Sequence, residues 1–346
     1  MPILPKSNRP SLELDFQVSP SWQRDMQKAI RSVKSLLEYL ELDPKDAPYS
    51  VDDSAKFPLL VTQSYANKMV KGSWQDPLLL QVLPKSEERN LNPNYVDDAV
   101  GDLPAQVIPG LLHKYSSRAL LMSAPNCAIH CRYCFRREFP YETLPHGKAN
   151  WLAAWTYLES SPEIEEIIFS GGDPLFMDNG RLENLLERAI ALPQIKTIRF
   201  HSRIPIVLPS RIDAGLIEIF RKVVAKKSLV MVIHSNHPHE IAGDCKLALS
   251  ELKESGALLL NQSVLLKGIN DTCDILTELS RVLLQSGVLP YYMHQLDRVT
   301  GTAHFEVLEK DGLKLMAELR AKLPGYLVPR YVRELSGEAH KTLISG

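Results

Sequence analysis

Three cysteines stand close together near the middle of the chain, at Cys127, Cys131 and Cys134, and the whole sequence has only five. Thiolates spaced Cys-x3-Cys-x2-Cys can share one soft inorganic centre, either zinc or an iron–sulfur cluster. Structural zinc usually takes four protein ligands, commonly from two separated pairs. A loop of three cysteines therefore favours a four-iron cluster with one iron left open. A zinc site, or buried reduced thiols, is the alternative.

Two short motifs near the cysteines suit ligand binding. Gly171-Gly172-Asp173 directly follows the apolar run Ile167–Phe169, and paired glycines let the backbone approach a ligand closely. Arg136, followed by Arg137, can grip a carboxylate in a bidentate fork. Taken alone, the first motif is also an ordinary turn and the second an ordinary surface pair.

A lysine near the end of the sequence, Lys341, is a further candidate. Lysine is the residue that binds pyridoxal phosphate covalently. A lysine in this place is more often solvated, and the local sequence by itself does not promote it.

The elements that must position these residues begin at about residue 118. Short apolar runs alternate there with amphipathic stretches, which indicates β/α units and a parallel sheet. The runs are 119–122, 167–169, 197–200, 229–233, 258–266 and 289–293, and the stretches are 150–160, 181–191, 213–226, 239–255, 271–286 and 305–322. Six such units predict an α/β fold, a partial (β/α)6 barrel of the TIM type.

Polar residues follow the predicted strands at their carboxyl ends, where parallel barrels carry their chemistry. The first strand leads into the cysteine loop and the second into 170–174. The remaining strands end in or carry 201–203, 234–238, 261–263 and 294–297. We therefore expect these side chains to meet at one mouth of the barrel.

The barrel is predicted to span 111–325, between an N-terminal mainly helical extension, 1–110, and a C-terminal segment, 326–346, that closes the barrel. Within the extension, the pattern predicts a helix over 19–42, a helical segment over 64–71, an extended piece over 76–84 and a connection over 89–110. The C-terminal segment begins with an extended stretch, 326–332.

Composition excludes several classes of protein. Lys and Arg number 40 against 41 for Asp and Glu, so there is no electrostatic footprint for nucleic acid or an anionic membrane. The start of the chain lacks a signal-peptide core, and no apolar run is long enough to span a bilayer. The cysteines do not suggest a disulfide scaffold, so we expect a cytoplasmic protein.

The cysteine spacing, with Tyr133 just before the last cysteine, resembles the signature of the radical S-adenosylmethionine enzymes. Further stretches, in the same order along residues 55 to 341, resemble the lysine 2,3-aminomutase family. They are 109–115 with Arg118, 127–137, 170–175, 200–212, 236–240 and 261–270. The resemblance implies a radical S-adenosylmethionine barrel that uses a [4Fe-4S] cluster, S-adenosylmethionine and pyridoxal 5′-phosphate. It also implies an isomerase that moves an amino group between adjacent carbons of an amino acid.

The resemblance assigns roles to single residues. It implies that the three cysteines ligate the cluster and that Lys341 binds pyridoxal phosphate and is catalytic. Arg136 would hold the substrate carboxylate, and Asp297 and Glu334 its distant ammonium group. The remaining cofactor-binding residues implied are Tyr133 against the adenine, Gly171, Gly172 and Asp173 at the amino group of S-adenosylmethionine, and Tyr115, Arg118, His234 and Gln262. Because two carboxylates buried in a cleft need a cation, the pair favours lysine as the substrate.

The end of the chain departs from the family pattern. Residues 336–340 replace a glycine run before the lysine, Glu334 replaces an aspartate, and extra cysteines for a structural zinc are missing. These features resemble the branch that makes (R)-β-lysine, which a separate ligase attaches to elongation factor P. We therefore expect L-lysine as the substrate and an indirect link to elongation factor P and its ligase, and leave a homo-oligomer open. The alternatives are an aminomutase for arginine or glutamate, and a non-catalytic protein that binds a cluster or S-adenosylmethionine.

Overall fold

The computed structural model describes residues 21–144 and 151–345, and its centre is a single ten-stranded sheet in which strand order follows the chain. Strands β3 to β9 are parallel, whereas β1 and β2 form an antiparallel ribbon before them and β10 pairs antiparallel with β9. The partial barrel expected from the sequence is thereby confirmed. The strands are β1 Gln106–Ile108, β2 Leu111–Tyr115, β3 Arg118–Ala124, β4 Glu166–Gly171, β5 Thr197–Ser202, β6 Ser228–His234, β7 Leu258–Val264, β8 Leu289–His294, β9 Arg330–Arg333 and β10 Thr342–Leu343.

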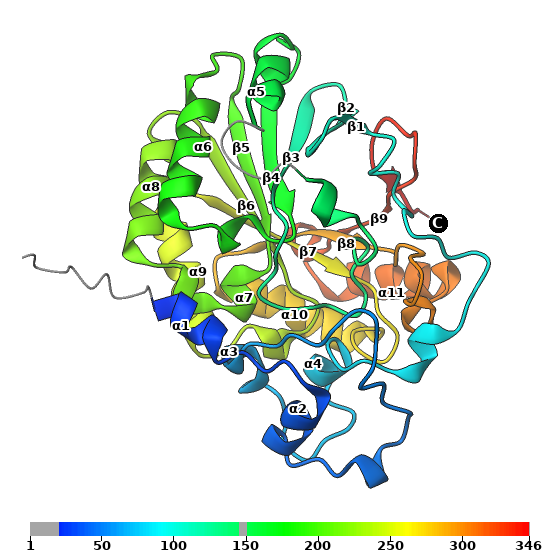
Figure 1. Cartoon of the computed structure of the whole chain (residues 1–346). Coiled ribbons are helices and arrows are strands. Elements are labelled where there is room, and N and C mark those ends of the chain that lie inside the picture. Colours follow the sequence, from blue (N-terminus) through cyan, green and yellow to red (C-terminus); the bar gives the residue numbers. More distant parts are fainter. Residues whose placement is uncertain (1–20, 145–150, 346) are drawn as a thin grey trace, which may run out of the picture.

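Six longer helices alternate with these strands, as the sequence predicted, and Figure 1 shows α5, α6, α8 and α9 on the outer side of the sheet. Several begin at a side chain that accepts a hydrogen bond from the first turn: Asp178 for α6, Asp213 for α8 and Thr272 for α10. The helices are α5 Leu152–Glu159, α6 Asn179–Ala191, α8 Ala214–Val224, α9 Asp244–Glu254, α10 Cys273–Gln285 and α11 Glu309–Lys322. A short helix, α7 Ile204–Val207, follows β5. Asn150, the expected start of the first barrel helix, lies outside the described residues.

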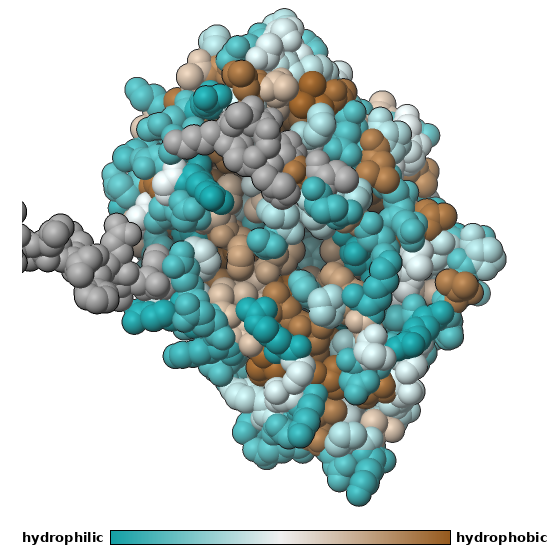
Figure 2. All heavy atoms as spheres, in the orientation of Figure 1, coloured by the Kyte–Doolittle hydropathy of each residue, from teal (hydrophilic) through white to brown (hydrophobic). Residues whose placement is uncertain are grey.

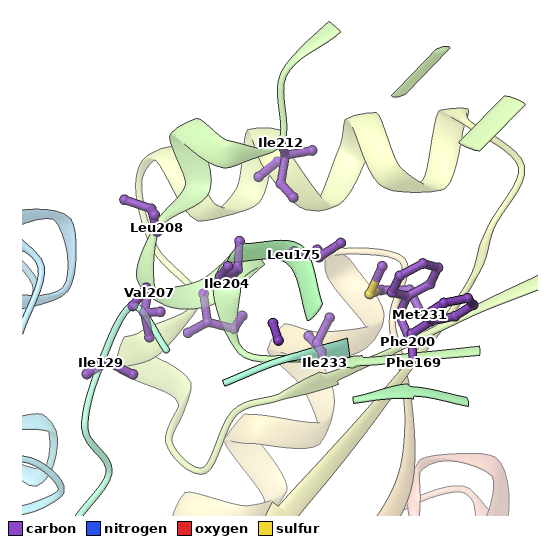
Figure 3. Packing of buried hydrophobic residues seen from close by; sticks show 14 of the residues in the cluster. Ile129, Phe169, Leu175, Phe200, Ile204, Val207, Leu208, Ile212, Met231 and Ile233 are labelled. Carbon is purple, nitrogen blue, oxygen red and sulfur yellow. The ribbon is translucent and has the colours of Figure 1, made fainter. Parts of the chain in front are cut away.

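Alternation along the strands separates an apolar outer layer from a polar interior. On β5, Phe200 is fully buried and stacks on Phe169 of β4 with ring centres 5.0 Å apart, beside Met231 of β6 (Figure 3). Arg199 and His201, the neighbours of Phe200 in sequence, are less buried. Since successive side chains of a strand point to opposite faces, the polar pair projects into the barrel.

The predicted helix over 19–42 is wrong in its middle. Two short helices occupy the described part, α1 Ser21–Gln27 and α2 Val33–Tyr39. Between them the chain extends, and Ile30 exchanges backbone hydrogen bonds of 2.7 and 2.9 Å with Val61. Ser32 then caps α2 by accepting from the amide of Ser35. The pairing with a distant segment outweighs the helical pattern. Residues 19 and 20 lie outside the described residues.

The extended piece expected over 76–84 is also wrong. Residues Pro77–Leu80 form helix α4, because Asp76 accepts hydrogen bonds from the amides of Leu78 and Leu79. An aspartate before a proline at the first helical position is a helix start, which is why this stretch is not a strand. The helical segment expected over 64–71 is the short α3, Gln63–Ala66, and the expected connection over 89–110 contains strand β1.

The N-terminal extension packs against one end of the barrel, where Figure 1 shows α1 to α4. One hydrophobic cluster runs from Trp22 to Val288 and includes residues of both regions. Thr62 donates to the carbonyl of Val207, and Lys68 donates to the carbonyl of Ile206 at 2.8 Å. The N-terminal extension and the barrel therefore share one hydrophobic core. The domain boundary at residue 110 stays a prediction.

The C-terminal segment returns to the sheet. A turn at Gly325–Leu327 precedes β9, which pairs with β8 at Val332 and His294, so the expected extended stretch begins later than predicted. Figure 1 shows this segment beside the connection that leads to β1. Figure 2 shows the same view with hydrophilic residues along much of the rim and apolar residues exposed toward the middle. None of the helices in the described ranges is long and apolar enough to cross a membrane.

Candidate active site

A cavity of about 200 Å³ lies at the carboxyl ends of the parallel strands. It brings together most of the residues that the sequence singled out, from segments between Asp102 and Lys341. Its charged, polar and sulfur-bearing lining residues are Asp102, Cys127, Cys131, Tyr133, Cys134, Arg136, Tyr141, Ser170, Asp173, His201, Ser202, Arg203, His234, Gln262, His294, Asp297, Glu334 and Lys341. The expectation that the strand ends share one mouth is confirmed.

The three cysteines are free thiols that face this cavity on the loop after β3. Arg132, within the loop, is fully buried, pairs with Glu88 and donates to the carbonyl of Phe57 at 2.8 Å, so the N-terminal extension holds the loop in place. Burial, reinforced by the nearby Cys131, raises the pKa of Cys134 to about 11. A bound metal centre would release these protons, because thiolates are the metal ligands.

The three thiols can serve as soft donors to a metal centre, because each of them lines the cavity. Among the described side chains, no group of three or more His, Cys, Asp or Glu is placed to hold a metal ion. In a four-iron cluster each thiolate would bind a different iron. The cluster at these cysteines stays a prediction.

The glycine turn after β4 packs directly against the chain that leads into the cysteine loop. A Cβ on Gly172 would lie 2.5 Å from the carbonyl oxygen of Asn126, and one on Gly171, where φ is +126°, would meet the carbonyl oxygen of Ala124. The amides of Gly172 and Asp173 donate to these same carbonyls at 2.7 and 2.8 Å. The glycines are thus required by close approach. Contact of the turn with S-adenosylmethionine stays a prediction.

Asp173 holds the ends of two strands together. Its carboxylate accepts from the Ser202 hydroxyl and the Arg203 amide, both at 2.7 Å, and from the amide of Leu175 at 3.1 Å. Burial raises the pKa of Asp173 to about 6, although the hydrogen bonds from Ser202 and the backbone amides oppose this. The sequence predicted Asp173 as a cofactor ligand, but it did not predict that the carboxylate joins the ends of β4 and β5.

Tyr133 and His234 form a neutral aromatic pair at the cavity. Their rings are stacked with centres 5.6 Å apart, and the Tyr133 hydroxyl lies 2.9 Å from His234 Nε2 and 3.2 Å from Gln81 Oε1. Burial holds the pKa of His234 well below its usual value, so the ring is uncharged at neutral pH. Gln262 is the register partner of His234 on β7 and also lines the cavity. The contact of this pair and of Gln262 with S-adenosylmethionine stays a prediction.

Arg136, on the cysteine loop, begins a chain of ion pairs across the cavity. Its Nε lies 2.7 Å from Asp102 Oδ2, and Nη1 donates to the Ser170 hydroxyl at 3.0 Å. Lys114 bridges Asp102 and Glu334 at 2.6 and 2.8 Å, and Lys341 pairs with Glu334. The sequence singled out neither Asp102 nor Lys114. Lys114 lies within the matched stretch 109–115, whereas Asp102 lies in a polar connection that gives no signal.

Asp297 is the unpaired acid of the site. Within the described residues no side chain or amide donates to its carboxylate, and it lines the cavity. Burial raises the pKa of Asp297 to about 7, although the charge of Lys341 opposes this. A carboxylate in this state gains from a cationic ligand, as the sequence predicted for a substrate ammonium group.

The surroundings of Lys341 fit an anionic cofactor. Nε2 of His294 is buried without a partner among the described residues, and the ring lines the cavity. Burial, and then the nearby positive charges of Arg199, Lys341 and Arg136, keeps the pKa of His201 well below its usual value. The unused Nε2 of His294 and the cations near His201 are groups that a phosphate can contact, and the binding of pyridoxal phosphate here stays a prediction.

Tyr115 and Arg118 are not among the described residues that line the cavity. They face each other across the turn between β2 and β3, with the guanidinium 4.4 Å from the ring centre. Burial raises the pKa of Tyr115, and the charge of Glu334 adds to this, so the ring stands near the end of the charged chain. Their part in binding a cofactor stays a prediction.

Arg203 directly follows β5, and the sequence indicated it only as one of the polar residues 201–203 after a predicted strand. It is fixed by the Tyr65 hydroxyl, Gln81 and the Glu240 carboxylate, at 2.8 to 3.1 Å. Its Nη1 donates to the sulfur of Cys131 at 2.7 Å. A buried cation thus supports the middle cysteine.

Comparisons with known proteins place the chain in a family. No protein-family model matches it. The chain is 41% identical to the L-lysine 2,3-aminomutase of Escherichia coli K12 over 322 residues, which are 93% of each protein. The enzyme of that name from Haemophilus influenzae is 41% identical, with 93% of this chain and 95% of that protein covered, and the one from Acetoanaerobium sticklandii is 30% identical, with 93% and 77% covered. Among solved structures, a radical SAM methyltransferase from Sphaerobacter thermophilus aligns with a TM-score of 0.41 and 17% identity over 64% of this chain and 68% of that one. Identity of this extent over nearly the whole length shows that the chain belongs to the L-lysine 2,3-aminomutase family.

Proposed function

We propose that this protein is an isomerase that converts L-α-lysine to (R)-β-lysine. The observation that carries the proposal is the cavity itself, where three thiols, Arg136, the carboxylates of Asp297 and Glu334, and Lys341 meet. Relatives that carry the name L-lysine 2,3-aminomutase over 93% of the chain support the same activity.

The two ends of lysine find opposite charges in the cavity. Nη2 of Arg136 has no hydrogen-bond partner in the described ranges, while Nε and Nη1 are held by Asp102 and Ser170. This leaves the two N–H groups of Nη2 available for a carboxylate. At the other end Asp297 is unpaired and Glu334 is ionised. An acidic amino acid would place a second negative charge against these two carboxylates, so glutamate is disfavoured.

The donor set and the charges support the three cofactors of the family. When bound, the [4Fe-4S] cluster and S-adenosylmethionine would supply a hydrogen-abstracting radical, and pyridoxal phosphate would supply an aromatic ring that delocalises the unpaired electron while the amino group migrates. Cys127, Cys131 and Cys134 would hold the cluster, and Lys341 the pyridoxal phosphate. Tyr133 would lie against the adenine, and the turn Gly171–Asp173 with His234 and Gln262 would hold the rest of S-adenosylmethionine.

The chain's own residues keep the site ordered and shielded. Glu334 holds the amino group of Lys341 at the cavity wall. Burial keeps His201, His234 and His294 uncharged at neutral pH, so their rings add no competing cation. Val207, Val264 and Leu296 form apolar parts of the wall. Such a wall keeps water from a radical reaction.

We extend the proposal to the fate of the product. Residues 336–340 before Lys341, together with Glu334, resemble the branch that supplies (R)-β-lysine for elongation factor P, so a lysyl ligase would consume the product in the cytoplasm.

Anaerobic reconstitution tests the function. The protein is loaded with iron, sulfide, S-adenosylmethionine and pyridoxal phosphate, reduced, and given L-lysine, L-arginine or L-glutamate in separate reactions. We expect (R)-β-lysine, identified by chiral chromatography and mass spectrometry. β-Arginine or β-glutamate in its place would assign another substrate, and zinc without iron or sulfide would reject radical chemistry.

A further inference from the structure

Two charged side chains stand between the two ends of the substrate site, and neither is assigned to the substrate or to a cofactor above. They are Asp102, in the connection before β1, and Lys114, on β2. Arg136 Nε lies 2.7 Å from Asp102 Oδ2, and Lys114 Nζ lies 2.6 Å from Asp102 Oδ1 and 2.8 Å from Glu334 Oε1. Direct contacts therefore link the residue predicted to bind the carboxylate with one predicted to bind the ammonium group.

Both linking residues are already bound to other charged groups of the site. Lys114 also donates to the carbonyl of Val100 at 2.8 Å, and with Asp102 and Glu334 this uses the three donors of an ammonium group. Each oxygen of Asp102 is taken by one cation, and the side chain is 2% exposed. Lys114 therefore has no donor left for the substrate, and Asp102 acts through the two cations that it binds, Arg136 and Lys114.

The chain of ion pairs is charged throughout at neutral pH. Burial alone would raise the pKa of Glu334, but Lys341 and Lys114 hold it below its usual value. Burial also opposes the charge of Lys114, yet Asp102 and Glu334 raise its pKa. When the amine of Lys341 leaves Glu334 to react, Lys114 remains as a partner. Glu334 then stays ionised and in place for the substrate.

The backbone around Asp102 is fixed against the segment that carries Glu334. The Asp102 amide donates to Asp98 Oδ1 at 2.8 Å. Gly101 has a φ of +68°, and a Cβ there would meet the side chain of Ser336, two residues after Glu334. This close approach and the ion pairs together connect the backbone at Asp102 with the segment that carries Glu334.

Resting on the proposed function, we propose that Lys114 and Asp102 are positioning residues that fix the separation of Arg136 and Glu334 and thereby select the length of the substrate. Neither end can move toward the other without breaking one of these ion pairs. L-Ornithine, which has one methylene less than lysine, would fail to reach both ends. One methylene changes kcat/KM roughly 10- to 200-fold where a pocket measures it.

The test compares L-lysine and L-ornithine as substrates of the reconstituted wild type and of Lys114→Met. We expect the variant to raise the KM for lysine about tenfold or more, because removing one member of a buried charge pair releases the other. We also expect the lysine-to-ornithine ratio of kcat/KM to fall about tenfold or more. Lys71→Met is the matched control, because Lys71 forms an exposed ion pair with Glu41 at 2.7 Å and lies outside the cavity lining. Its KM and ratio should equal those of the wild type.

Asp102→Asn and Lys114→Arg keep the test decisive if Lys114→Met does not fold, as judged by thermal unfolding. Asparagine keeps the shape of Asp102 without its charge, so it should also lower the lysine-to-ornithine ratio. Arginine keeps the charge of Lys114 on a longer arm and would hold Glu334 farther from Arg136, so it should raise the ratio. An unchanged ratio in folded variants, including equal losses with both substrates, overturns the inference. A wild type that does not convert lysine contradicts the proposed function, and this inference with it.

Discussion

Lys341 is the residue whose role depends least on its local sequence and most on where the fold places it. Its amine meets Glu334 at the cavity wall, next to His294, although the chain reaches this point only after β9. We expect Lys341→Ala to abolish the formation of β-lysine in the reconstituted enzyme and to leave its iron and sulfide content and cluster spectrum unchanged, because the cysteine loop lies on another segment. Lys310→Ala, at an exposed position on α11, is the control. Normal turnover in Lys341→Ala would rule out the assignment.

Asp297 gives the site a pH dependence of definite sign. Burial raises the pKa of Asp297 to about 7, so without substrate the carboxyl is largely protonated below that pH and ionised above it. Since an ammonium group binds the ionised form, kcat/KM for lysine should fall as the pH drops through 7. The other charges that act on this carboxyl are those of Lys341, Glu334, Asp102 and Lys114. A pH profile of kcat/KM between 6 and 8 measures the effect.

Asp297→Asn separates this residue from other groups that titrate in the same range. It should remove the inflection near pH 7 and raise the KM for lysine by roughly 10- to 100-fold, the usual loss for a hydrogen bond to a charged group. An inflection that persists in the variant would assign the titration elsewhere.

At the scale of elements, the glycine turn after β4 and the cysteine loop after β3 form one unit. A methyl group on Gly172 would lie 2.5 Å from the carbonyl of Asn126, so the turn and the loop must separate to accept it. We expect Gly172→Ala to lower the iron bound after reconstitution and to destabilise the fold by about 1–3 kcal/mol, as overpacking does. Iron analysis and thermal unfolding measure the two effects.

Gly325→Ala is the matched control, because a Cβ there meets no atom within 4 Å. It should leave iron binding unchanged. Full iron binding by Gly172→Ala would show that the close packing is not needed for the cluster.

The whole molecule has one continuous core across the N-terminal extension and the barrel. Leu36 of α2 is fully buried and belongs to the same cluster as Phe200 of β5. We expect Leu36→Ala to lower the free energy of unfolding by about 2–5 kcal/mol. The unfolding should remain a single transition when followed by tryptophan fluorescence and by circular dichroism.

Leu91→Ala, at a side chain that is 90% exposed, should leave the stability within about 0.5 kcal/mol of the wild type. Two separate transitions in Leu36→Ala would instead show that the extension unfolds on its own, as a domain boundary at residue 110 implies.

Much of the site was predictable from the sequence because its signals are local. The spacing of Cys127, Cys131 and Cys134 lies within one loop, and the alternation of apolar runs with amphipathic stretches predicts the six barrel units. Parallel strands then bring Asp173, His234 and Asp297 to one edge by topology alone. The break between α1 and α2 was not predictable, since it depends on the pairing of Ile30 with a distant strand-like segment.

The sequence by itself therefore determined the barrel, the cluster loop and the acids and bases at the strand ends. Only the tertiary structure decided how Arg136, Asp102, Lys114 and Glu334 join into one chain of ion pairs. Lys114 and Glu334 are 220 positions apart, and no local pattern encodes a contact over that distance. The physical reason is that spacing within a loop or helix is set by backbone geometry, whereas the partner of a buried charge is set by packing of the whole chain.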